Sequence, residues 1–76
     1  MEITLDRLEP DILCTVLEVR SPEPLRSRLR QFGLVAGTVV SVRYRSPDGG
    51  VTALELRGTV VALRTRELKK IRVRLL

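Results

Sequence analysis

The stretch that decides the fold of this chain is Leu25-Arg26-Ser27-Arg28-Leu29-Arg30-Gln31-Phe32-Gly33-Leu34-Val35-Ala36-Gly37-Thr38-Val39-Val40. Leu25, Leu29 and Phe32 recur at the spacing of one helical face, which predicts a short amphipathic helix. Gly33 supplies the left-handed backbone position that ends such a helix. Leu34 can then pack back onto the last turn, and the chain is free to leave in a new direction.

The residues before this helix predict how it begins and what precedes it. Ser21-Pro22-Glu23-Pro24 is a helix start, in which Ser21 is the expected N-cap and proline occupies the first turn. Ile12–Val19 is apolar and β-branched, so it is expected to be the first strand. Thr4–Leu8 fits a single helical turn that stops near Pro10.

The residues after the helix predict further strands. Thr38–Arg45 alternates, with Val40, Val42 and Tyr44 on one face and Ser41, Arg43 and Arg45 on the other. Proline and glycine in Ser46–Gly50 predict a hairpin turn. More strands are expected at Val51–Arg57, Thr59–Leu63 and Ile71–Leu75, with a helical turn at Thr65–Leu68. We therefore expect residues 1–76 to form one mainly β domain, a small barrel of about five strands with one short α-helix after the first strand.

Charge is distributed unevenly along the 76 residues. Residues 1–24 carry six acids against two arginines, and residues 25–76 carry twelve basic residues against three acids, so their net charges are −4 and +9. A basic segment of this kind suggests an anionic partner surface, although a solvated face would have the same composition. Single-stranded nucleic acid is one alternative partner, but such sites usually add stacking aromatics, and the chain offers only Phe32 and Tyr44.

Several kinds of chemistry are missing from the sequence. There is no histidine, and the single Cys14 lies in an apolar run, where a buried structural thiol is favoured over a reactive one. We therefore expect no catalytic residues, no cofactor and no tight metal site, which leaves only weak surface contacts for a transition metal ion. No signal peptide and no long apolar span is recognisable, so we expect a cytoplasmic protein without direct membrane insertion.

Two signature stretches and an opening pattern together resemble the FeoA family of bacterial ferrous iron transport. The first is residues 25–40, whose signature positions are Leu25, Leu29, Gly33 and Gly37. The second runs from Gly58 through Leu63 to Val73, and the opening pattern is Thr4-Leu5-x-x-Leu8-x-Pro10. Ala36 and Asp11 stand where family members commonly carry proline and glycine.

The resemblance implies an SH3-like barrel without catalytic activity. It also implies a protein-interaction role, as accessory or regulator of FeoB, the membrane GTPase and ferrous iron permease, through the FeoB cytoplasmic domain. The residues expected to contact the partner are Arg26, Arg30, Leu34, Arg43 and Arg45, with Leu34 near an exposed tip. The alternatives are a small basic nucleic-acid-binding barrel and a relative of the C-terminal SH3-like domain of metal-dependent repressors.

Overall fold

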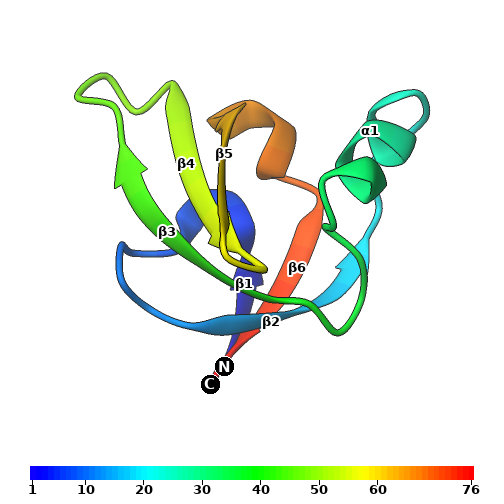
Figure 1. The fold of residues 1–76 in the computed structure, drawn as a ribbon, viewed down its shortest axis with the longest axis horizontal. Coiled ribbons are helices and arrows are strands. Elements are labelled where there is room, and N and C mark those ends of the chain that lie inside the picture. The colour runs from blue at the N-terminus through cyan, green and yellow to red at the C-terminus, as the bar shows by residue number, and fades with distance from the viewer.

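Six strands in one antiparallel sheet form the framework of the protein in the computed structural model, which describes residues 1–76 (Figure 1). The strand order is β1-β6-β2-β3-β4-β5, so the two chain ends lie side by side and β5 ends the sheet on the other side. The elements in chain order are β1 (Glu2–Thr4), η1 (Leu5–Arg7), β2 (Cys14–Val19), α1 (Leu25–Gln31), β3 (Val39–Arg45), β4 (Val51–Leu56), β5 (Thr59–Arg64), η2 (Thr65–Leu68) and β6 (Ile71–Leu75), where η marks a 3-10 turn.

The predicted mainly β fold with one short helix is confirmed, with one more strand than expected. The additional strand is β1, which pairs with β6 and places Ile3 opposite Val73. Three residues are too few to show an alternating pattern, and their partner lies at the other end of the chain. The helix consequently follows the second strand and not the first. That second strand begins at Cys14, two residues later than expected, and Ile12 and Leu13 before it are exposed.

Strand β3 departs from the alternation that its sequence predicts. The pairing register with β4 shifts between Val42 and Tyr44, which is a β-bulge. A bulge inserts one extra residue, so the side chains beyond it exchange faces. Val42 is fully buried, whereas Tyr44 is 57% exposed and Arg45 turns into a half-buried position. The prediction that Tyr44 shares the face of Val42 is therefore wrong.

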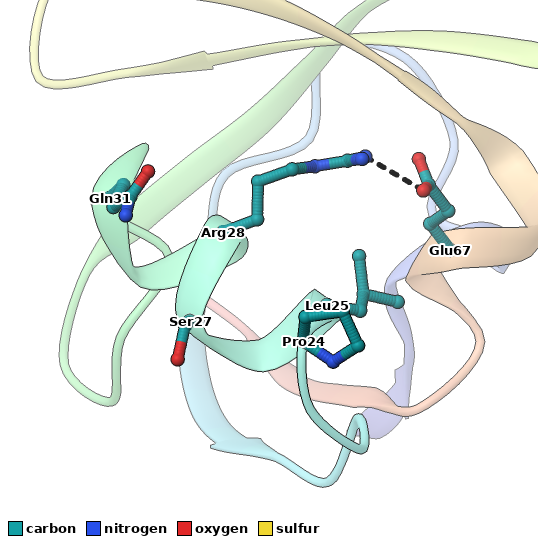
Figure 2. A pocket seen from close by; sticks show the side chains of 6 residues that line it. All are labelled: Pro24, Leu25, Ser27, Arg28, Gln31 and Glu67. Atoms are coloured by element: carbon teal, nitrogen blue, oxygen red, sulfur yellow. Dashed lines mark hydrogen bonds and ion pairs between the residues drawn. The ribbon is translucent and has the colours of Figure 1, made fainter.

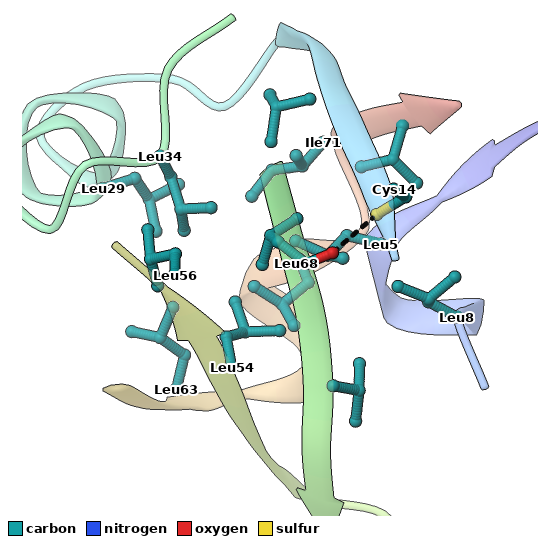
Figure 3. Close-up of a cluster of buried hydrophobic side chains, with 14 residues drawn as sticks. Leu5, Leu8, Cys14, Leu29, Leu34, Leu54, Leu56, Leu63, Leu68 and Ile71 are labelled. Atoms are coloured by element: carbon teal, nitrogen blue, oxygen red, sulfur yellow. Dashed lines mark hydrogen bonds between the residues drawn. The ribbon is translucent and has the colours of Figure 1, made fainter. Parts of the chain in front are cut away.

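A cluster of 14 buried apolar residues forms the hydrophobic core of the protein (Figure 3). Leu29 and Leu63 from the two signature stretches belong to it, and Leu25 packs against it. Cys14 is also buried there, and its thiol donates a hydrogen bond to the Val40 carbonyl oxygen at 3.4 Å. Burial raises the pKa of the Cys14 thiol to about 11, because the thiolate would lose its hydration. The interpretation of Cys14 as a structural thiol is confirmed.

Helix α1 begins at Leu25, later than the sequence predicts. Glu23 supplies the acceptor at this end: its carboxylate accepts hydrogen bonds from the Ser27 hydroxyl at 2.7 Å and from the Ser27 backbone N–H at 2.9 Å. These hydrogen bonds, with the charge of Arg26 nearby, lower the pKa of Glu23. Ser21 is buried, and its hydroxyl has no hydrogen-bond partner. The prediction that Ser21 is the N-cap is wrong, because the helix starts too far beyond it.

The other end of α1 has the predicted glycine exit. Gly33 has a φ of +96°, and its N–H donates to the Arg30 carbonyl at 2.9 Å. The Leu34 N–H donates to the Leu29 carbonyl at 3.0 Å. Together these two hydrogen bonds form a Schellman motif, which closes the helix and reverses the chain. Gly37 also has a positive φ, so both glycines of this segment serve backbone geometry.

Candidate functional site

The two helix arginines expected at a docking site lie at the surface of α1. Both Arg26 and Arg30 are exposed. Arg26 lies 3.6 Å from the Glu23 carboxylate, a loose ion pair, whereas Arg30 forms no ion pair. Of the two, Arg30 therefore has the guanidinium that is free to meet an anionic partner.

Leu34 does not lie near an exposed tip, and that expectation is wrong. Its side chain is 1% exposed and packs in the core beside Leu29 (Figure 3). The cause is the Schellman motif, which turns the residue after Gly33 back towards the helix. Leu34 therefore stabilises the helix end and offers no surface to a partner.

The two arginines of β3 are already engaged within the protein. The Arg43 guanidinium lies 3.0 Å from the Glu55 carboxylate on the neighbouring strand. Arg45 donates to the Thr52 hydroxyl at 3.0 Å and to the Leu8 carbonyl at 3.1 Å, so it fastens the segment after η1 to the sheet. The end of β3 and helix α1 lie on opposite sides of the molecule (Figure 1). The five predicted contact residues therefore do not form one surface.

A set of basic side chains around β5 was not predicted from the sequence. Arg57 precedes this strand, Arg64 ends it, and Arg66 follows in η2; all three are exposed and none forms an ion pair. Elsewhere most of the exposed or half-buried arginines are paired with glutamates, namely Arg20, Arg26, Arg28, Arg43, Arg72 and Arg74. The only sequence signal for the unpaired set is the net charge of residues 25–76, which does not show which arginines find partners.

A hollow joins the C-terminal end of α1 to the start of β5, and we call it the Phe32 hollow. Its lining includes Arg30, Phe32, Arg57, Thr59 and Val61. Phe32 is 38% exposed, so its side chain is not buried with the apolar helix face that the sequence predicts. The hollow thus combines an exposed aromatic ring with two unpaired guanidinium groups.

A second hollow lies between α1 and η2, and we call it the Arg28 hollow (Figure 2). The Arg28 guanidinium crosses it and lies 2.7 Å from the Glu67 carboxylate. Glu67 also accepts a hydrogen bond from the Arg64 backbone N–H at 3.1 Å. Gln31 lines both hollows.

No group of three or more cysteine, aspartate or glutamate side chains is placed to hold a metal ion. None of the helices has the length and apolar character needed to span a membrane.

Comparison with known proteins places the chain in a family. The FeoA domain model matches residues 3–75. The FeoA-like protein from Clostridium acetobutylicum is 31% identical, with a TM-score of 0.88, over 99% of this chain and 87% of that chain. The zinc complex of FeoA from Stenotrophomonas maltophilia is 29% identical, with a TM-score of 0.80, over 95% of this chain and 89% of that chain. Among curated protein sequences, none matches this chain.

The fold is shared beyond these proteins. A manganese-dependent transcriptional repressor is 17% identical, with a TM-score of 0.88, over 99% of this chain and 41% of that chain, which shows the fold alone. The Stenotrophomonas maltophilia protein is described as a prokaryotic SH3 domain protein, so the predicted SH3-like fold is confirmed. With the family model covering nearly every residue, the chain belongs to the FeoA domain family.

Proposed function

We propose that this chain is a non-catalytic docking module of bacterial ferrous iron transport, which binds the cytoplasmic domain of the GTPase-permease FeoB and regulates it from the cytoplasm. The observation that carries the proposal is the match of residues 3–75 to the FeoA domain. The relative from Stenotrophomonas maltophilia is described as possibly acting as a ferrous iron transport activating factor. An accessory role in transport is consistent with that description.

The surface around β5 supports a docking role. Arg30, Arg57, Arg64 and Arg66 are exposed and unpaired, so their charge is available to an acidic surface. Phe32 adds exposed aromatic area beside two of them. Aromatic and arginine side chains are the residue types that contribute most binding energy at protein interfaces.

A nucleic-acid-binding barrel is the second candidate, because the Phe32 hollow places one aromatic ring beside Arg30 and Arg57. The other exposed aromatic side chain, Tyr44, lies on β3. Single-strand sites usually offer successive aromatic platforms along a basic groove. One aromatic ring in the hollow therefore supports a protein partner more than a nucleic acid.

A genetic experiment tests the proposed function. In a strain that lacks this gene and retains FeoB, the wild-type protein should restore ferrous iron uptake. The double variant Arg30→Glu, Arg57→Glu should fail to do so, because it reverses two unpaired charges of the surface. Arg7→Glu is the matched control, since Arg7 is exposed and unpaired but lies beside the chain termini. Normal uptake in the deletion strain would contradict the proposal.

A further inference from the structure

Strand β5 has one edge that pairs with no other strand. It pairs only with β4, and it ends the sheet order. In Figure 1, β4 lies on one side of β5, and η2 and then helix α1 lie on the other. Thr59 and Val61 of β5 line the Phe32 hollow together with the C-terminal end of α1. An exposed strand edge presents unpaired N–H and C=O groups, which makes it a template for another strand.

The register shows which backbone groups point to this open edge. Arg57 and Gly58 form a two-residue hairpin turn with positive φ values of 51° and 76°, so Leu56 and Thr59 face each other as a hydrogen-bonded pair. Hydrogen-bonded pairs recur at every second residue of an antiparallel ladder. Thr59, Val61 and Leu63 therefore bond to β4, and Val60 and Ala62 direct their N–H and C=O groups away from it.

Two hydrogen bonds beyond the hairpin agree with this assignment. The Thr65 N–H donates to the Gly50 carbonyl at 2.9 Å, which continues the bonded series towards β4. The Arg64 N–H points the opposite way and donates to the Glu67 carboxylate at 3.1 Å. Val60 and Ala62 have the same parity as Arg64, and neither has a backbone partner on the open side. Both residues are exposed, Val60 to 54%.

The charges around the open edge indicate the charge of the segment that would bind there. Arg57 and Arg30 lie at its beginning, and Arg64 and Arg66 lie at its end. Glu67 is neutralised by Arg28, and Glu55 on the neighbouring strand is neutralised by Arg43. Asp48 lines a third hollow together with Arg64 and Arg66, and it forms no ion pair. The free charge at both ends of the edge is therefore predominantly positive.

We propose that an extended acidic segment of the partner protein adds to the β5 edge as a further strand. The segment hydrogen-bonds to the backbone of Val60 and Ala62, and its carboxylates meet Arg57 and Arg64. Alternate side chains of the segment enter the Phe32 hollow. Main-chain bonds give such strand addition its affinity, and the pockets and flanking charges give it its specificity. The inference rests on the proposed docking function and names its mode of binding.

A proline at the open edge tests the proposal, with a fluorescently labelled peptide of sequence EEVTVTEE as the probe. Ala62→Pro removes an N–H that points away from β4, so the ladder with β4 keeps its hydrogen bonds, and proline is tolerated at such edge positions. We expect peptide affinity to fall roughly tenfold or more. Ala62→Val retains the N–H and should bind as the wild type does. Equal peptide binding by Ala62→Pro and Ala62→Val, with both proteins folded by circular dichroism, overturns the proposal.

Methylated peptides provide a test that leaves the protein unchanged. A strand added at one edge uses the N–H groups of alternate residues only. Of two peptides N-methylated at alternate positions, in opposite phase, one should retain binding to the wild-type protein and the other should lose it. Equal binding of both overturns the proposal even if Ala62→Pro fails to fold.

Two further measurements separate this inference from its competitors. The FeoB cytoplasmic domain should bind the wild-type protein and lose affinity for Ala62→Pro; equal binding to both leaves the proposed function intact and overturns strand addition alone. Mixed-sequence single-stranded DNA needs the basic side chains but not the edge N–H groups. Tight DNA binding that Ala62→Pro leaves unchanged, without binding of the acidic peptide, also overturns the proposal.

Discussion

The guanidinium of Arg28 lies 2.7 Å from the carboxylate of Glu67 and joins helix α1 to the 3-10 turn after β5 (Figure 2). Glu67 is the less exposed partner, with 17% of its side-chain surface accessible. Its carboxylate also accepts a hydrogen bond from the Arg64 backbone N–H. The contact therefore holds the helix against the segment that carries the unpaired arginines.

Removing Glu67 should weaken the protein more than removing Arg28. Glu67→Ala loses an ion pair and leaves the Arg64 N–H without its acceptor, so we expect about 1–2 kcal/mol of destabilisation. Arg28→Ala should cost less than about 1 kcal/mol, because the Arg28 side chain is half exposed. Urea unfolding measures both values. Arg26→Ala is the control, since its 3.6 Å pair with Glu23 is exposed and should contribute almost nothing.

Leu34→Ala should behave as a core substitution. The side chain is 1% exposed, so we expect a loss of roughly 2–5 kcal/mol in the free energy of unfolding. Leu13→Ala, at a position that is 56% exposed, should change stability by less than about 0.5 kcal/mol. Denaturant unfolding of the two variants checks this contrast. Wild-type stability for Leu34→Ala would contradict the buried position.

Gly33→Ala should destabilise the exit of the helix. Its φ of +96° lies in the left-handed region, where an L side chain costs about 1–2 kcal/mol. The added Cβ would lie 3.4 Å from Leu56 Cδ1, an ordinary contact, so backbone strain is the main cost. Gly33→Asn should lose less, because asparagine tolerates this region better. Thermal unfolding ranks the three proteins, and equal stability of wild type and Gly33→Ala would refute the assignment.

Cys14 should make the protein less stable at alkaline pH. Its pKa is 9.0 when unperturbed and about 11 in the fold, so the unfolded chain releases the thiol proton first as pH rises. The stability that the protonated thiol contributes is fully present below about pH 9 and is lost between about pH 9 and pH 11. The loss of stability is about 1 kcal/mol near pH 10. Urea unfolding of wild type and Cys14→Ala at about pH 8 and about pH 10 isolates it. The difference between the two proteins should shrink at the higher pH.

Local patterns in the sequence predicted the parts of the fold that depend on neighbouring residues. The helix with its Gly33 exit and the hairpins follow from spacing and turn chemistry, and all are present. Strand β1 was missed because its identity depends on pairing with β6 at the far end of the chain. The position of Tyr44 was misjudged because a bulge depends on the partner strand and leaves no mark in the alternation.

The candidate site was predicted only in part, for a related reason. Charge counting indicated a basic surface, and Arg30 belongs to it. Which arginines remain free depends on cross-strand pairs such as Arg43 with Glu55, and those follow from register. The open edge of β5 is also a property of the whole sheet order. Neither Arg57 nor Arg64 could be distinguished from the other arginines before the strands were arranged.

Calorimetric titration of the FeoB cytoplasmic domain into the purified protein is the most direct test of the proposed docking function. We expect saturable binding that weakens as salt rises, because unpaired arginines contribute to it. Arg30→Glu with Arg57→Glu should abolish that binding, and Arg7→Glu should retain it. No saturable binding of wild type to the GTP-bound, GDP-bound or nucleotide-free domain would contradict the docking function.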